Sequence, residues 1–294
     1  MNTELIKISD ELFLKLGKMI TERYGIKMPP QKKIMFQARL QRRLRELNLD
    51  SFDEYAEKLF HESGESTEFA ILADYISTNK TDFFREKEHF NFVSSSVLPA
   101  LLTVQSALRV PQVRLWSAGC SGGQEAYSLA ISLEEFKRQR NIPFDYTILA
   151  TDISGRMLRI AKQAVYASRQ VDEIPPEIKH RYFLKSKNPE DQQVKVVKEI
   201  RDRVKVGYLN LMNPSYHFEY QFDVVFLRNT LIYFDLNTQR SVLQKVLEKL
   251  KPGGFLFIGH AESLINLNLP ILPVSPSVYI KTNDRNQEML NFKV

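Results

Sequence analysis

The sequence predicts an α/β protein: a doubly wound, Rossmann-like parallel sheet with a small N-terminal helical domain and a small antiparallel β insertion. Two observations predict the sheet. An apolar run at residues 113–118 meets a bend of small residues at 119–123, and helical spacing resumes from Gln124. A second apolar run ends on Asp152 and is again followed by a helical pattern. Such alternation is typical of a parallel sheet covered by helices. Purely helical spacing over residues 5–75 predicts the helical domain.

The chain has 294 residues, 43% of them hydrophobic and 26% charged, which is typical of a globular protein with one large and one small domain. No apolar run approaches the roughly 18–20 residues that span a membrane, and the first residues do not resemble a signal peptide, so we expect a cytoplasmic protein. The single cysteine, Cys120, excludes an internal disulfide and a multi-cysteine metal site, and we expect it to pack rather than react. The net charge of +6 favours an acidic partner: nucleic acid, an anionic membrane surface or an acidic protein.

Apolar residues at helical spacing predict four helices, within residues 5–20, 36–47, 51–60 and 68–75. The second is the most basic segment of the chain, and only Glu46 opposes its cations, which are Lys32, Lys33, Arg39, Arg42, Arg43 and Arg45. These side chains either form an ordinary solvated face or dock an acidic partner, and the sequence leaves both alternatives open.

The helical domain is followed, at residues 77–86, by a polar cluster that runs into paired aromatic residues and Arg85. A flexible linker would be small and polar throughout, so we expect this one to pack against the next domain. Arg85 either forms a salt bridge with Glu86 or Glu88, or faces a bound cofactor or substrate.

The glycine-containing loop after the first strand lets a ligand approach the backbone, and free N–H groups at the start of the next helix favour polar or anionic groups. In a doubly wound sheet, an acid at the end of the second strand hydrogen-bonds a ribose diol. Asp152 is therefore the predicted ribose ligand; alternatively it caps the following helix, a role for which Ser154 competes. Together the loop and the acid leave two cofactor classes, the dinucleotides and S-adenosylmethionine.

Alternating apolar and charged residues at 193–199 and 201–206 predict half-exposed strands, which we interpret as an antiparallel insertion at about residues 184–207. Its cations either contact a partner or protect exposed strand edges. Buried strands at 222–229 and 255–259, a helix at 238–250 and a last antiparallel strand at 278–281 complete the predicted sheet. Because ligands bind beyond the carboxyl ends of such strands, we expect Arg228, Asn229 and Tyr233 near Asp152.

Five motifs, in the same order along the chain, resemble those of the CheR family of bacterial chemotaxis receptor methyltransferases. They are NKTDFFRE at 79–86, WSAGCSGGQEAYS at 116–128, ATDI at 150–153, FLRNTLIYFD at 226–235 and LKPGGFLFIGHAES at 250–263. The resemblance runs from about residue 10 to about residue 282. It implies a helical domain over 1–76, a linker over 77–92 that contributes to the active site, and a methyltransferase domain over 93–294. The implied reaction transfers methyl from S-adenosylmethionine to glutamate carboxylates of methyl-accepting chemotaxis receptors and leaves S-adenosylhomocysteine.

The resemblance also implies the site residues. Cofactor contacts are expected from Asn79, Thr81, Arg85, Gly119, Glu125, Asp152, Asn210, Leu211, Leu227 and Arg228. Tyr233 matches a tyrosine beside the transferred methyl group, so Arg85 and Tyr233 are the predicted catalytic residues, acting as positioners. A glutamate side chain, with a reference pKa of about 4.3, is already ionised at neutral pH, and no general base is needed. Arg85 or Arg228 could hold this carboxylate, and no metal is expected.

The chain departs from the family pattern in its glycine loop and in its insertion. Gln124 and Ala126 stand where typical members have glutamate and proline, while Glu125 is retained. The loop at 185–193 lacks the glycines of members that bind a receptor's C-terminal pentapeptide. Binding of the cofactor is expected to survive the first change, whereas tethering by the pentapeptide is not expected.

The expected partners are therefore the cytoplasmic helices of chemotaxis receptors, docked directly on Arg39, Arg42 and Arg43. Nucleic acid is not expected, because residues 228–233 lack the Asn/Asp-Pro-Pro-Tyr/Phe string of amino-methylating enzymes. Contact with the membrane is expected only through receptors, and the protein is expected to be a monomer. The alternative function is a non-catalytic, S-adenosylmethionine-binding signalling scaffold.

Overall fold

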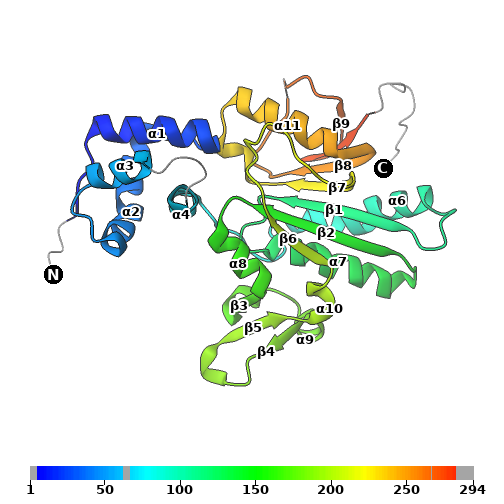
Figure 1. Cartoon of the computed structure of the whole chain (residues 1–294). Coiled ribbons are helices and arrows are strands. Elements are labelled where there is room, and N and C mark those ends of the chain that lie inside the picture. Colours follow the sequence, from blue (N-terminus) through cyan, green and yellow to red (C-terminus); the bar gives the residue numbers. More distant parts are fainter. Residues whose placement is uncertain (1–4, 62–66, 266, 283–294) are drawn as a thin grey trace.

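The computed structural model describes residues 5–61, 67–265 and 267–282, and it contains the predicted doubly wound sheet (Figure 1). Seven strands lie in the order β6-β2-β1-β7-β8-β10-β9. They are β1 (Gln112–Ala118), β2 (Asp145–Asp152), β6 (Val204–Tyr208), β7 (Phe222–Leu227), β8 (Leu250–Ile258), β9 (Ile271–Ser275) and β10 (Val278–Lys281). Neighbours from β6 to β8 are parallel, whereas β10 and β9 are added antiparallel, as predicted for the last strand.

Helices cover both faces of this sheet (Figure 1). Alternate residues of each strand point to opposite faces, so each strand contributes side chains to the core on both sides. In β7, Val225 and Leu227 pack on the side of α11 (Leu236–Lys249), and Phe226 packs on the side of α7 (Gln124–Arg140). The Phe226 ring stacks on Phe257 of β8 with 4.4 Å between centroids. The α7 side also receives apolar residues from α5 (Lys87–Phe92), η2 (Val93–Val97), α6 (Leu98–Val104) and α8 (Gly155–Gln163).

The strand order places a ligand crevice at the centre of the sheet. From β1 the chain moves outward to β2 and β6, and then returns to β7 on the opposite side of β1. Connections on the two sides of such a switch point diverge and leave a crevice beyond the carboxyl ends of the strands. Gly119, Asp152 and Arg228 directly follow or end β1, β2 and β7, so all three lie at this edge.

The helical domain consists of α1 (Asp10–Tyr24), η1 (Pro30–Lys32), α2 (Lys33–Leu47), α3 (Phe52–His61) and α4 (Thr67–Ile76). The first helix starts and ends later than the predicted range, because the Ser9 hydroxyl caps it by accepting from the N–H of Leu12 at 3.1 Å and Gly25 ends it with φ of +71°. Leu16 and Leu40 are fully buried in a core that belongs to this domain. None of the helices in the described ranges has the length and apolar character needed to cross a bilayer.

The small antiparallel sheet is confirmed, but one of its predicted strands is wrong. It has the order β3-β5-β4, formed by β3 (Val165–Ala167), β4 (Phe183–Lys185) and β5 (Gln193–Val196), with η3 (Ser168–Val171), α9 (Pro176–Tyr182), η4 (Pro189–Asp191) and α10 (Lys198–Arg201) around it. The predicted strand at 201–206 is instead β6, which runs parallel to β2 with Val204 opposite Ile148. An edge strand of a large sheet is half-exposed, so its alternation of residues looks like that of an insertion strand.

Candidate active site

A cavity lies at the carboxyl ends of β1, β2 and β7, where the helical domain meets the sheet. The predicted site residues that line it are Asn79, Thr81, Arg85, Gly119, Glu125, Asp152, Asn210, Leu211, Arg228 and Tyr233. Leu227 is the exception, because its side chain is fully buried in β7 and packs in the core on the α11 side. The tertiary structure therefore brings together residues from the linker, the loop and three strand ends.

Backbone hydrogen bonds hold the loop between β1 and α7. The N–H groups of Gly119 and Cys120 both donate to the carbonyl of Thr151, at 2.8 and 2.9 Å. Gly119 has φ of +81°, and a Cβ there would lie 2.5 Å from Oγ1 of Thr230, so a larger residue would strain this turn. Cys120 is buried as expected, and burial raises the pKa of its thiol well above the usual range, which keeps the thiol protonated.

Asp152 joins this loop to the start of α8. Its Oδ2 accepts from the N–H of Ser121 at 2.7 Å, and its Oδ1 accepts from the N–H of Ser154 at 2.9 Å. Ser154, and not Asp152, caps α8, because the Ser154 hydroxyl accepts from the N–H of Met157 at 3.1 Å. Burial raises the pKa of Asp152, while the backbone donors oppose the shift. A carboxylate has about four acceptor positions, so Asp152 can still accept from a ligand hydroxyl in the cavity.

Arg228 is buried at the centre of an ion-pair network. Its Nη2 donates to the carbonyl of Arg85 at 2.5 Å and to Oε2 of Glu86 at 3.0 Å. Its Nη1 lies 3.4 Å from Oε2 of Glu125, whose Oε1 accepts from the hydroxyl of Ser117 at 2.7 Å. That Arg228 holds a substrate carboxylate stays a prediction, and two carboxylates of the protein already contact its Nη1 and Nη2. Arg228 fixes the linker against the first turn of α7.

Arg85 is exposed and lines the cavity. Its Nη1 donates to the carbonyl of Lys80 at 3.2 Å, and within the described part of the chain it forms no ion pair with Glu86 or Glu88. The salt-bridge alternative is thus wrong, because Glu86 pairs with Arg228. The charge of Arg85 remains available to a ligand anion.

The helical domain forms one wall of the cavity, which the sequence did not predict. It contributes Tyr24, Ile26, Lys32 and Met35. The N–H of Lys27 donates to the carbonyl of Tyr233 at 3.1 Å and ties this wall to η5 (Leu231–Tyr233). Nζ of Lys32 lies 6.0 Å from the centroid of the Tyr233 ring. Burial lowers the pKa of Lys32, and the nearby charges of Arg39 and Lys27 add to the shift. The only sequence signal for Lys32 was its place in the basic segment.

Glu262 is a second residue that sequence reasoning missed, although it belongs to the motif at 250–263. Its carboxylate accepts from four backbone N–H groups, those of Gly259 at 2.6 Å, Leu231 at 2.7 Å, Asn229 at 2.9 Å and Ile232 at 3.3 Å. Burial raises the pKa of Glu262 against the effect of these donors. Glu262 therefore fixes the turn that carries Tyr233.

Asn210 and Leu211 lie after β6 in the connection to β7. Nδ2 of Asn210 donates to the carbonyl of Arg23 at 2.9 Å, and its Oδ1 accepts from the N–H of Met212 at 2.9 Å. Asn210 thereby connects this loop to the end of α1, while Leu211 adds apolar surface to the cavity. The hydrogen bond from Asn210 to Arg23 helps to hold the helical domain over the strand ends.

The predicted basic surface of α2 is largely neutralised within the protein. Arg43 donates to both carboxylate oxygens of Glu68, at 2.9 and 2.5 Å, and Glu68 is only 3% exposed. Arg39 donates to backbone carbonyls at the end of α4. Arg42 differs, because 81% of its side chain is exposed and its partner is the neighbouring Glu46. The prediction that Glu46 alone opposes these cations is wrong, since Glu68 reaches Arg43 only through the fold.

The cavity contains polar groups that a ligand would satisfy. Nδ2 of Asn79 is buried and has no hydrogen-bond partner among the described residues, so it would donate to an acceptor of the ligand. Burial raises the pKa of Glu125 as well as that of Asp152, and a positively charged ligand would offset this cost. A ligand with hydroxyl groups, acceptors and positive charge fits these residues. S-Adenosylmethionine has all three in its ribose, adenine, sulfonium and amino-acid groups.

Comparisons with known proteins show the family of this chain. Residues 79–278 match the family model described as CheR methyltransferase, SAM binding domain, and residues 11–77 match the model described as CheR methyltransferase, all-alpha domain. The chain is similar to the chemotaxis protein methyltransferases of Borreliella burgdorferi, Salmonella typhimurium and Escherichia coli, with 33%, 32% and 33% identity. These alignments cover 94%, 96% and 96% of this chain and 96%, 94% and 94% of the relatives. The chain therefore belongs to the CheR methyltransferase family, and its cofactor is S-adenosylmethionine.

Proposed function

We propose that this methyltransferase acts on glutamate side chains of methyl-accepting chemotaxis receptors and produces glutamate γ-methyl esters and S-adenosylhomocysteine. The relatives that are described as chemotaxis protein methyltransferases support the pathway. The observation that carries the substrate class is the presence of cations, among them Arg85 and Lys32, in the same cavity as the cofactor residues. A carboxylate is the protein side chain that these cations would attract.

The reaction needs alignment more than proton transfer. S-Adenosylmethionine, when bound, supplies a methyl group that its sulfonium has already activated. Because the glutamate carboxylate is ionised at neutral pH, an oxygen lone pair can form the bond to the methyl carbon while the carbon–sulfur bond breaks and its electron pair stays on sulfur. The residues of the cavity must therefore hold the carboxylate in line at near-attack distance.

Arg85 and Lys32 are the residues that would hold the carboxylate, since Arg228 is engaged by Glu86 and Glu125. Tyr233, close to Lys32, would orient one oxygen through its hydroxyl. A firm grip on the carboxylate would stabilise the ground state more than the transition state, so these residues act as positioners.

A basic groove next to the cavity is the proposed docking surface for the receptor. Arg39, Arg42, Arg43, Asp74, Arg156 and Arg159 line it, together with Ser77 and Asn79, which it shares with the cavity. Arg42, Arg156 and Arg159 are exposed. Asp74, the acidic residue of this groove, accepts a hydrogen bond from the hydroxyl of Ser154 at 2.5 Å, so its carboxylate is already engaged within the protein. An acidic receptor helix in this groove would carry its glutamate toward the cavity.

The scaffold alternative differs from this proposal only in lacking methyl transfer, and the similarity to methyltransferases favours the enzyme. A cytoplasmic location, membrane contact only through receptors and a monomeric state remain predictions.

Transfer of a labelled methyl group from S-adenosylmethionine to receptor-containing membranes tests the proposal. We expect saturable binding of S-adenosylmethionine and base-labile label on the receptor, because an ester hydrolyses in mild base whereas an N-methyl group does not. Cofactor binding without transfer to any receptor of the source organism would favour the scaffold. Base-stable label would overturn the assignment of glutamate as the acceptor.

A further inference from the structure

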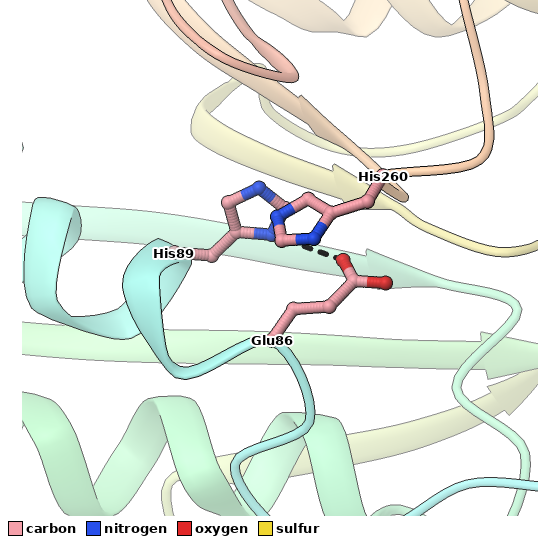
Figure 2. A group of neighbouring side chains, drawn as sticks. All are labelled: Glu86, His89 and His260. Carbon is pink, nitrogen blue, oxygen red and sulfur yellow. Dashed lines mark ion pairs between the residues drawn. The ribbon is translucent and has the colours of Figure 1, made fainter.

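Three side chains converge beside the active-site cavity, two from the start of α5 and one from a distant part of the sequence (Figure 2). Glu86 directly precedes α5, His89 lies in α5, and His260 follows β8. One potential ligand atom of each lies within 4.8 Å of those of the other two. Nδ1 of His89 is 3.5 Å from Oε2 of Glu86, and the two imidazole rings have centroids 4.9 Å apart. None of the three lines the cavity itself.

His89 is buried, yet its side chain forms no hydrogen bond with the described residues. It is 2% exposed and packs edge-on against Phe226 and Phe257. Neither ring nitrogen has a hydrogen-bond partner among the described residues. A buried polar group without a partner is costly and rare in folded proteins. A neutral imidazole whose nitrogen faces a carboxylate and a second imidazole is, however, well suited to bind a metal ion.

The surrounding charges also leave room for a cation. Arg228 is shared between Glu86 and Glu125, at 3.0 and 3.4 Å, and the carboxylate of Glu262 is buried close by. Three acidic side chains, Glu86, Glu125 and Glu262, thus surround the cation Arg228. Oε2 of Glu86 accepts from Arg228, whereas Oε1 has only a long contact of 3.4 Å with Nδ2 of Asn229. Glu86 can therefore keep its arginine and offer Oε1 to an ion.

We propose that Glu86, His89 and His260 bind a divalent transition-metal ion of the zinc type. Two imidazole nitrogens and one carboxylate oxygen, with an open position, are a ligand set that suits zinc. Ligand bonds of about 2.1 Å in a tetrahedral site require donor atoms roughly 3.4 Å apart. Oε2 of Glu86 lies 3.5 Å from Nδ1 of His89, so a small movement of the carboxylate would bring Oε1 to this separation, and His260, which is exposed, can close the remaining gap. The ion would tie the linker residue next to Arg85 to the end of β8.

Metal titration of the untagged full chain, after treatment with a chelator, tests this site without depending on methyl transfer. We expect one Zn²⁺ per chain by calorimetry and, with Co²⁺ as the probe, the intense visible absorption of a tetrahedral complex. His260→Ala removes an exposed ligand, so the protein should fold normally and lose at least about 10-fold in Zn²⁺ affinity. His180→Ala, which removes an exposed histidine of α9, is the matched control and should leave the affinity unchanged.

The proposal is overturned if the protein shows no saturable binding at one ion per chain. It is also overturned if His260→Ala binds Zn²⁺ as tightly as the unaltered protein, or if His180→Ala loses as much affinity as His260→Ala. His89→Gln provides a second check on the buried ligand. If this variant does not fold, the comparison between His260→Ala and His180→Ala still decides the question.

Discussion

Nη2 of Arg228 lies 3.0 Å from Oε2 of Glu86, and this pair joins the end of β7 to the linker. The Arg228 side chain is 1% exposed and the Glu86 side chain 13%. The contact places the neighbouring Arg85 at the cavity, since Arg228 also binds the Arg85 carbonyl. The buried charge of Arg228 therefore stabilises the arrangement of the site, while Arg85 is exposed and lines the cavity.

Arg228→Met should lower the free energy of unfolding by about 3–5 kcal/mol, because it leaves Glu86 and Glu125 without their cation. Glu86→Gln should cost less, since Arg228 keeps Glu125. Urea denaturation of both variants and of the double variant measures the coupling, which we expect to be about 0.5–3 kcal/mol. Strict additivity would show that the pair does not contribute as a unit.

Tyr233→Phe and Asp152→Asn should separate catalysis from cofactor binding. Loss of the Tyr233 hydroxyl should reduce the rate of methyl transfer about 10-fold and leave the affinity for S-adenosylmethionine unchanged. Asp152→Asn removes a charged acceptor and should weaken cofactor binding about 10- to 100-fold, as expected for a hydrogen bond to a charged group. Calorimetry and single-turnover transfer are the two measurements. An equal loss of affinity in both variants would contradict these roles.

Lys32→Met should raise the KM for the receptor more than it changes the affinity for S-adenosylmethionine, because we assign Lys32 to the substrate carboxylate. Lys33→Met is the matched control, since Lys33 pairs with Asp10 on the surface at 2.6 Å and does not line the cavity. Steady-state methylation of receptor membranes provides the comparison. Similar KM values in the two variants would remove Lys32 from the substrate site.

The arginines of α2 should differ in their effects. Arg43→Ala should destabilise the protein by about 3 kcal/mol, because Glu68 is then buried without its partner. Arg42→Glu should lower the free energy of unfolding only slightly, through loss of the exposed pair with Glu46. It should reduce receptor methylation, since the Arg42 side chain is exposed in the docking groove. Charge reversal at Arg45, which is exposed on α2 but does not line the groove, is the control. Equal methylation by all variants would contradict docking on this groove.

The affinity for S-adenosylmethionine should depend on pH through Glu125. Burial raises the pKa of this carboxyl, so the charged form that attracts a cationic ligand is lost as pH falls through a value above the usual range of a glutamate. Affinity should therefore begin to fall at a higher pH than the reference value of about 4.3 would suggest. Glu125→Gln should bind more weakly at neutral pH and show a flatter profile. Calorimetric titrations at several pH values measure both effects.

Most of the fold could be predicted from the sequence, because the spacing of apolar residues and the turn residues that define helices and strands lie within short stretches of the chain. The loop at 119–123 and the acid at Asp152 predicted a ligand site at the ends of β1 and β2, and both line the cavity. The strand at 201–206 was misplaced because alternation records exposure and not which sheet a strand joins. Ser154 and Asp152 were both reasonable caps in sequence, and only the hydrogen bond from Met157 chooses between them.

The sequence by itself determined the family, the cofactor class and the residues that follow the strand ends, since these depend on contiguous motifs and on the spacing of apolar residues. Only the tertiary structure decided what the charged side chains do. Arg228 and Glu86 are 142 positions apart, and Arg43 and Glu68 are 25 apart. Whether a charge is buried and paired or exposed and free depends on chain segments that meet only after folding, and so does the position of Lys32 in the cavity wall.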